Sequence, residues 1–305
     1  MNKRLLAVDI GGSKTRIRVL DTNANTLSEY CGIGVSSAID GNSTLPPLER
    51  LISTVQEKET VGAIAINLGG LNTTQVLNTF RIFFPDLPIK IFRESEGTAA
   101  YALADEYGAK IVLMAGTGAI AVGKSNGKFV TTGGWGMNVG DDGSGYDIGL
   151  QAIRTTLSKL DGIEPLSPLE KFISGYDTPF MATDNPSAYR EQRDKVIEKL
   201  YPLERQRIAS LAKNVLDFAE KGDESALAIF KRVGVKMAEL VVATAEKLGE
   251  EFPVIIVTGG LINSRKFWAP IFEDALKNYT VHYVADGLLL GTSYIAKKLY
   301  ETGEI

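Results

Sequence analysis

The chain has 305 residues, 44% of them hydrophobic and 23% charged, and its net charge is −4. At roughly 150 residues per domain this length predicts two globular domains, and the composition excludes wholesale disorder and a collagen-like repeat. A mildly acidic chain is also a poor candidate for non-specific binding to nucleic acid or to an anionic membrane.

The first predicted elements form a β-hairpin. An apolar run at 5–10 ends in the glycine pair Gly11 and Gly12, and residues 15–20 then alternate between apolar and polar. Both patterns are typical of strands. The start of the chain lacks the apolar stretch of a signal peptide, and no window reaches the roughly 18 apolar residues of a membrane span. We therefore expect a soluble, cytoplasmic protein.

A second hairpin is predicted further along the chain. A helix at about 48–58, a strand at 89–92 and the start of another helix lead to the apolar run 111–115, the turn at 116–118 and the strands 120–122 and 128–130. The repeated run, glycine turn and strand suggest an internal duplication. The alternative is that two α/β domains share the same local patterns.

Helices dominate the last part of the chain, where apolar residues recur at helical spacing. Asp223 and Gly249 are suitable as the caps of one long helix. The least clear stretch is 160–202, where proline, serine, aspartate and tyrosine are frequent, with helical pieces between them. The predicted elements are helices at 203–221, 223–249, 264–278 and 287–300 and strands at 254–258 and 280–284. Strands that alternate with helices predict an α/β fold.

Two short motifs are interpreted as coincidental. Residues 118–125 fit the phosphate-binding pattern G-x-x-x-x-G-K-S, and 116–121 fit the dinucleotide pattern G-x-G-x-x-A. Both patterns need a helix directly after the glycine loop. Here the central residues are apolar and strand-like, and Asn126 and Gly127 predict a turn instead.

Two glycine turns are candidate phosphate sites. Residues 9–15 place Asp9 before a glycine pair and hydroxyl side chains after it, and residues 115–118 repeat the glycine chemistry. Glycine lets the backbone approach a phosphate closely, and an acid can hold Mg²⁺ through water. The alternative is an ordinary hairpin turn whose glycine serves the backbone alone.

Two further segments carry candidate chemistry. Glu96, with Glu94 as a neighbouring candidate, follows a strand and precedes a helix, where a carboxylate can accept a proton from a hydroxyl or simply cap the helix. Residues 133–146 surround Trp135, Asp141 and Asp142 with glycines. Carboxylates bind sugar hydroxyls and an aromatic ring covers an apolar sugar face, although a core tryptophan in a glycine-rich loop is the alternative.

In this order, the motifs resemble the actin/hexokinase/Hsp70 ATPase superfamily, within it the N-acetylglucosamine kinase branch grouped with the BadF/BadG/BcrA/BcrD ATPases. The blocks GGWG at 133–136 and GDDGS at 140–144 are the most branch-specific, and VTGG at 257–260 resembles the adenosine motif. The resemblance implies two RNase H-like domains around a central cleft. The first would span 1–114 with a C-terminal helix at about 287–305, and the second 115–286.

The same resemblance implies an ATP-dependent sugar kinase that uses Mg²⁺ and forms a homodimer, with neither nucleic acid nor membrane as a partner. Its substrate would be a hexose or amino sugar such as N-acetylglucosamine, glucosamine, glucose or N-acetylmuramate. Glu96 would be the catalytic base, and Asp9 would hold the metal through water. The implied sugar-binding residues are Ser36, Thr117, Gly134, Trp135 and Asp141. The implied ATP-binding residues are Gly11, Gly12, Ser13, Lys14, Thr15, Gly116, Gly118, Gly259 and Gly260.

The sequence departs from the family pattern at three positions. Glu96 stands where the base is usually aspartate, Ala119 where the second phosphate motif usually has serine, and Ser36 where a sugar-contacting asparagine is usual. A non-catalytic or ATPase-only sugar sensor and a pantothenate kinase-like enzyme therefore remain alternatives. The activator ATPases of this superfamily hold an iron–sulfur cluster with two cysteines from each subunit, which Cys31 alone cannot supply.

Overall fold

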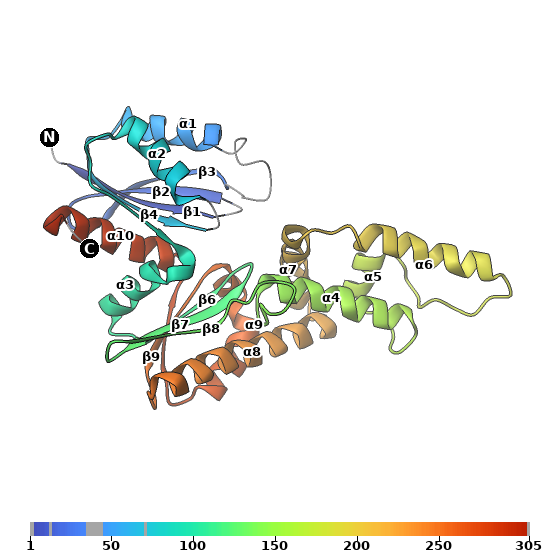
Figure 1. Cartoon of the computed structure of the whole chain (residues 1–305). Helices are drawn as coiled ribbons and strands as arrows, with labels where there is room; N and C mark the ends of the chain where they lie inside the picture. Colours follow the sequence, from blue (N-terminus) through green and yellow to red (C-terminus); the bar gives the residue numbers. More distant parts are fainter. Residues whose placement is uncertain (1–2, 12–13, 35–44, 70–71, 304–305) are drawn as a thin grey trace. The chain divides into compact units, whose positions relative to one another are not determined.

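The computed structural model describes residues 3–11, 14–34, 45–69 and 72–303 (Figure 1). Its contacts divide the chain into two compact units, which are unit 1 (residues 1–110 and 286–305) and unit 2 (residues 111–285). Each unit contains a mixed five-stranded sheet with helices packed on it, which confirms the predicted α/β class. Across the described ranges, every helix is too short or too polar to cross a membrane.

Unit 1 begins with a three-stranded antiparallel meander and continues with alternating helices and parallel strands. Its sheet has the order β3-β2-β1-β4-β5. The C-terminal helix returns to this unit. In chain order its elements are β1 (Arg4–Ile10), β2 (Lys14–Leu20), β3 (Thr26–Ile33), α1 (Leu45–Gln56), β4 (Val61–Leu68), α2 (Thr73–Phe83), β5 (Ile89–Arg93), the 3₁₀ turn η1 (Glu94–Glu96), α3 (Thr98–Tyr107) and α10 (Gly287–Thr302).

The sheet of unit 1 is buried on both faces, because successive residues of a strand point to opposite sides. Leu6, Val8 and Ile10 of β1 pack with α1 and α2 in one cluster, whereas Leu5 and Ala7 pack with α3 and α10 in another. The helices α3 and α10 approach each other so closely that a Cβ at Gly291 would overlap the backbone of Ala99. The second cluster therefore depends on a glycine in the middle of α10.

Unit 2 repeats the plan of a meander followed by helices and parallel strands, with a longer helical segment after the meander. Its sheet has the order β10-β9-β6-β7-β8. In chain order its elements are β6 (Ile111–Ala115), β7 (Ala119–Ser125), β8 (Lys128–Gly133), α4 (Gly145–Leu160), α5 (Pro168–Ser174), α6 (Pro186–Leu200), α7 (Arg205–Glu220), α8 (Glu224–Leu248), β9 (Val254–Thr258), the 3₁₀ turn η2 (Gly260–Ser264), α9 (Arg265–Ala275) and β10 (Thr280–Val284).

The two sheets have the same topology. In unit 1 the pairs β1–β2 and β2–β3 are antiparallel while β1–β4 and β4–β5 are parallel. In unit 2 the pairs β6–β7 and β7–β8 are antiparallel while β6–β9 and β9–β10 are parallel. The match supports the internal duplication predicted from the repeated hairpin.

The structure bears out the rejection of the two short motifs. Residues 119–125 form the strand β7, which turns at Asn126 and Gly127 into β8, so no helix follows the glycines. The predicted caps of the long helix are also confirmed, because the Asp223 side chain accepts the backbone N–H of Ala226 and Gly249 ends α8 at φ 70°. The elements β4, α2 and α4 are not among those predicted above, whereas α5 and α6 are the helical pieces expected, without bounds, within 160–202.

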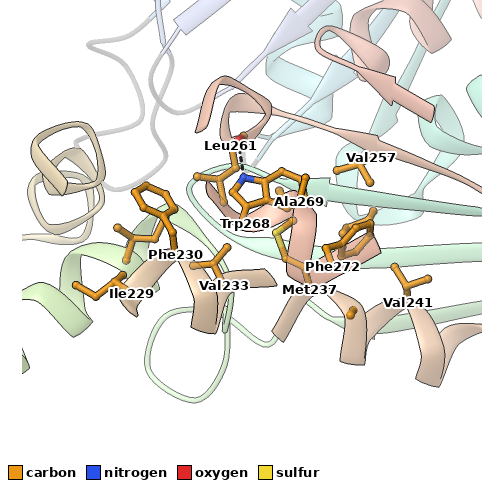
Figure 2. Packing of buried hydrophobic residues seen from close by; sticks show 14 of the residues in the cluster. Ile229, Phe230, Val233, Met237, Val241, Val257, Leu261, Trp268, Ala269 and Phe272 are labelled. Atoms are coloured by element: carbon orange, nitrogen blue, oxygen red, sulfur yellow. Dashed lines mark hydrogen bonds between the residues drawn. The ribbon is translucent and has the colours of Figure 1, made fainter. Parts of the chain in front are cut away.

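The core of unit 2 is centred on aromatic side chains between α8 and α9 (Figure 2). Trp268 is fully buried, and its indole N–H donates a hydrogen bond to the carbonyl of Leu261 at 3.0 Å. Its ring meets that of Phe272 edge to face, with the centroids 5.6 Å apart. This side chain joins α9 to the turn η2, which follows the predicted adenosine motif.

Replacing Trp268 with alanine should destabilise unit 2 by about 3–5 kcal/mol, because the change leaves a large cavity in the core. Urea unfolding followed by circular dichroism measures the effect as a lower midpoint. Tyr201→Ala is the matched control, since Tyr201 is 88% exposed and its removal should change stability by less than about 0.5 kcal/mol. Equal midpoints for the two variants would contradict the role of Trp268.

Candidate functional site

The carboxyl ends of three parallel strands meet at one edge of the unit 1 sheet. Asp9 near the end of β1 lies opposite Asn67 of β4, and Leu68 lies opposite Arg93 at the end of β5. The turn η1, which contains Glu96, follows Arg93 directly. Open α/β sheets place their reactive groups at this kind of edge. The fold therefore gathers Asp9 and Glu96, which are far apart in the sequence, at the same end of unit 1.

Asp9 is held by two neighbours. Its Oδ1 accepts a hydrogen bond from the Asn67 side chain at 2.9 Å, and its Oδ2 lies 3.4 Å from the Arg16 guanidinium. Asn67 is 1% exposed, and its own Oδ1 is buried without a partner in the part of the chain that the structure describes. The edge thus presents a fixed carboxylate beside an unused amide oxygen.

These oxygens fit a hydrated magnesium ion. Mg²⁺ prefers oxygen ligands, keeps several of its waters, and is usually bound by one or two carboxylates together with substrate phosphates. In the described ranges no group of three or more His, Cys, Asp or Glu side chains is placed to hold a metal. The oxygens of Asp9 and Asn67 therefore suit a metal that is held through water better than a metal enclosed by the protein.

Arg16 belongs to a cluster of charges on one face of β2. Its guanidinium donates to the carboxylate of Asp286, just before α10, at 2.5 Å, and Arg18 pairs with both Glu29 and Asp286. Burial raises the pKa of Asp286, but the hydrogen bond and charge of Arg16, with the charges of Arg18 and Lys14, outweigh it and hold that pKa below its ordinary value. The cluster fixes Arg16, which in turn holds Asp9.

Glu96 and Glu94 occupy the same 3₁₀ turn, and both are exposed. The turn ends at Gly97, whose φ of 70° is in the left-handed region that favours glycine, and α3 starts immediately after it. A Cβ at Gly69 would lie 3.0 Å from Glu94 Oε2, so the Glu94 carboxylate packs against the end of β4. Either carboxylate is a candidate base by position.

The other residues predicted in unit 1 differ in their exposure and in their hydrogen bonds. Lys14 is exposed on the face of β2 that carries Arg16, whereas Thr15 is 1% exposed and lies on the opposite face with the core residue Ile17. The Thr15 hydroxyl has no hydrogen-bond partner among the described residues. Gly11 begins the turn after β1, and its N–H donates to the carbonyl of Lys14. Three of the predicted residues lie outside the described ranges, namely Gly12, Ser13 and Ser36.

In unit 2 the predicted phosphate and adenosine motifs are neighbours. The turn at Gly116–Gly118 follows β6, and Gly259 follows the adjacent parallel strand β9. Gly259 has a φ of 108°, and a Cβ there would overlap the backbone of Ala115. Only glycine allows this close approach. Gly260 begins η2, beside the same strand end.

The predicted sugar loop begins with an exposed tryptophan. Trp135 is 78% exposed and lies between Gly134 and Gly136, whose φ values are 70° and 87°. A Cβ at Gly134 would lie 2.6 Å from Ile120 Cδ1, so this glycine lets the loop pack on β7. The alternative of a core tryptophan is thus wrong, and one ring face is available to a ligand.

The rest of the loop is joined to the phosphate turn by backbone hydrogen bonds, and two arginines contact its acidic side chains. The N–H groups of Gly145 and Tyr146 donate to the carbonyls of Gly116 and Thr117 at 2.8 and 3.2 Å. Asp141, which is 4% exposed, accepts from Arg205 at 3.0 Å. Asp142 of the loop and Asp147 in the first turn of α4 share one arginine, since Arg232 lies 3.0 Å from Asp142 and 3.6 Å from Asp147.

The sequence of the chain matches a known family. The model of the BadF/BadG/BcrA/BcrD ATPase family matches residues 6–285. The chain belongs to this family. The resemblance predicted from the glycine motifs is therefore confirmed, and the two duplicated sheets are those of an actin-like ATPase fold.

Two characterised relatives and one solved structure extend the comparison. The chain is 26% identical to the N-acetylmuramic acid/N-acetylglucosamine kinase of Clostridium acetobutylicum, and 25% identical to the N-acetyl-D-glucosamine kinase of Dictyostelium discoideum. Each alignment covers 92% of both chains. A candidate N-acetylglucosamine kinase from Chromobacterium violaceum has a similar structure, with a TM-score of 0.68 and 20% identity over 97% of this chain and 99% of the other.

Several residues of the site were not found by sequence reasoning. Asn67, Arg16 and Asp286 support Asp9, while Arg205 and Arg232 support the acidic loop. Asn67 had a usable signal, because it lies near the end of an apolar run that leads into a glycine pair at 69–70. Arg205 and Arg232 had none, since they come from helices far along the chain.

Proposed function

We propose that this protein is an ATP- and Mg²⁺-dependent kinase that phosphorylates a hydroxyl group of a hexose or amino sugar, with N-acetylglucosamine and N-acetylmuramate as the first candidates. The observation that carries the proposal is the junction in unit 2 of the glycine turn at 116–118 with the acidic loop at 140–145. This junction joins a phosphate-type turn to a buried carboxylate. Family membership and the names of the two relatives support the same assignment.

The proposed chemistry assigns a proton acceptor and a metal site to unit 1. Glu96 accepts the proton of the attacking sugar hydroxyl, whose oxygen then attacks the γ-phosphate of ATP in line while the bond from the γ-phosphorus to the bridging oxygen breaks and ADP leaves. Asp9 and Asn67 would hold Mg²⁺ through its waters, and the ion supplies positive charge to the phosphate oxygens when bound. Gly11 leaves room for a phosphate beside this edge.

Unit 2 supplies the residues that bind and orient the two substrates. The N–H groups of the turn at 116–118 and the glycines at 259–260 are proposed to contact ATP. Asp141 and the ring of Trp135 are proposed to bind the hydroxyls and the apolar face of the sugar. Catalysis then rests on positioning and on charge, as is usual for phosphoryl transfer.

The proposal is tested with a coupled assay of ADP release across a panel of acceptors, namely glucose, glucosamine, N-acetylglucosamine, N-acetylmuramate, N-acetylmannosamine and pantothenate. We expect ADP release that depends on both Mg²⁺ and one of the amino sugars. Quenching of Trp135 fluorescence gives binding independently of turnover, because the other tryptophan, Trp268, is fully buried and contributes a constant signal. Sedimentation of the same sample checks the proposed homodimer.

Each other outcome points to a different function. Sugar binding without ADP release would favour a sensor that has kept the fold, and the glutamate in place of the usual aspartate base is the feature that would explain it. ADP release with pantothenate alone would favour a pantothenate kinase-like enzyme. Neither binding nor turnover with any acceptor would contradict the proposal.

A further inference from the structure

The predicted sugar ligand Asp141 is held in an unfavourable state. Its side chain is only 3% exposed, and its φ of 64° places a non-glycine residue in the left-handed region. A buried carboxylate and a left-handed backbone both cost free energy unless a neighbour compensates for them. Proteins keep such local strain mainly at functional sites. The question is therefore what holds this carboxylate.

The compensating group is the side chain of Arg205, the first residue of α7. Its Nη2 donates to Asp141 Oδ2 at 3.0 Å, which forms a charge-assisted hydrogen bond. The Arg205 side chain is 43% exposed, and its guanidinium has further N–H groups. The arginine of the pair is therefore partly exposed at the surface of unit 2, whereas the carboxylate is buried. Arg205 is thus placed to set the direction in which the carboxylate points.

The pair rests on the phosphate turn. A Cβ at Gly118 would lie 3.0 Å from Asp141 Oδ1 and 3.3 Å from Arg205 Nη2. Glycine at this position therefore makes room for both charged groups. Backbone hydrogen bonds also hold this segment against the turn. The N–H of Ser144 donates to the carbonyl of Asp141, and that of Gly145 donates to the carbonyl of Gly116. The carboxylate has a fixed position relative to the turn.

Arg205 is itself held rigidly. The helix α7 packs along α4, and a Cβ at Gly149 of α4 would overlap the carbonyl of Ile208, one turn after Arg205. Such contact between helix backbones requires glycine and leaves the first turn of α7 little freedom. The arginine therefore starts from a fixed helix end, although it comes from a segment 64 residues beyond Asp141.

We propose that Arg205 is a positioning residue for the sugar site, which orients and neutralises Asp141 so that its carboxylate can accept sugar hydroxyls. The inference rests on the proposed function, because it requires Asp141 to contact the sugar. Arg205 acts through Asp141 and does not contact the reacting atoms. Its loss should therefore weaken the use of sugar without weakening the use of ATP.

The test compares Arg205→Gln and Arg205→Lys with Arg207→Gln. Arg207 is an exposed arginine on the same helix whose side chain makes no ion pair within the described part of the structure. Arg205→Gln should raise the KM for the sugar about tenfold to a hundredfold, which is the fold-change expected when a charge-assisted hydrogen bond is lost. The KM for ATP should stay within about threefold of that of the unchanged protein. Arg205→Lys should recover part of the loss because it keeps the charge, and Arg207→Gln should behave as the unchanged protein.

A double-mutant cycle with Asp141→Asn makes the test specific. Once the Asp141 charge is removed, adding Arg205→Gln should raise the KM for the sugar only slightly further. The effects of the two substitutions on this KM should therefore be well short of additive. Additive effects, or an unchanged sugar KM in Arg205→Gln, would overturn the inference. If Arg205→Gln folds poorly, the same cycle is run with Arg205→Lys in its place.

The experiment separates this inference from the proposed function. If the unchanged protein releases ADP with a sugar and Arg205→Gln does so equally well, the proposed function stands and the inference fails. If no sugar is phosphorylated, the same variants are compared for sugar binding by Trp135 fluorescence, where Arg205→Gln should show the same fold-loss in affinity. Absence of sugar binding by the unchanged protein would overturn both.

Discussion

Replacing Glu96 with glutamine is expected to lower kcat for sugar phosphorylation about 10²- to 10⁴-fold, the usual contribution of a general base. Glutamine keeps the size of the side chain and one acceptor oxygen, but its neutral amide cannot accept the proton. Glu96 is exposed in a turn that Gly97 closes, so the change should leave the fold intact. The KM for ATP should change little. Steady-state kinetics with the best acceptor of the panel measures both constants.

Glu94→Gln decides between the two carboxylates of this turn. A large loss of kcat in Glu94→Gln with near-normal activity in Glu96→Gln would assign the base to Glu94 and contradict our choice. Glu106→Gln is the matched control, because Glu106 is an exposed glutamate at the other end of α3. It should retain full activity, which shows that the loss of a glutamate charge near α3 is not enough to stop the reaction.

The parts of the fold that could be predicted are those whose sequence signal comes from neighbouring residues. The hairpins β1–β2 and β6–β7 each follow from an apolar run, a glycine turn and a second strand, so the signal lies within one short stretch of neighbouring residues. The caps Asp223 and Gly249 are equally local. The repeated pattern also suggested an internal duplication, which the two matching sheets support.

Some missed elements had a readable signal. The strand β4 has the same apolar run before glycine as β1, β6 and β9, and with it Asn67 could have been placed beside Asp9. In contrast, α6 buries only Val196 along its length, so its sequence lacks the apolar stripe that identifies a helix. Its helical state depends on its cap at Asn185 and on residues with good helix propensity.

The side chains that support the site could not be predicted in the same way. Arg16 meets Asp286, and Arg205 meets Asp141, only because strands and helices from distant segments are packed together. No spacing in the sequence relates these partners. Local chemistry thus identifies the residues that would contact the substrates, whereas the charges that orient them are visible only in the folded chain.

Asp9→Asn is expected to lower kcat about 10²- to 10³-fold at any Mg²⁺ concentration, the scale of a lost electrostatic contact to the transferring phosphate. The side chain is 21% exposed at the sheet edge, so it can reach a hydrated ion. An asparagine oxygen can still accept the hydrogen bond from Asn67, and the fold should therefore survive. What changes is the charge beside Arg16, which then has no carboxylate on the β1 side.

This loss has two measurable signatures. The Mg²⁺ concentration that gives half-maximal activity should rise, because a neutral amide attracts the hydrated cation less than a carboxylate does. Thermal unfolding should stay close to that of the unchanged protein. Asp86→Asn serves as the control, since Asp86 is an exposed aspartate in a loop of the same unit.

The prediction is contradicted if Asp9→Asn keeps kcat within about threefold of the unchanged protein and needs no more Mg²⁺. The carboxylate then does not hold the metal, since losing such a charge contact lowers kcat far more than threefold. The edge of unit 1 would in that case serve the phosphate through its glycine turn alone.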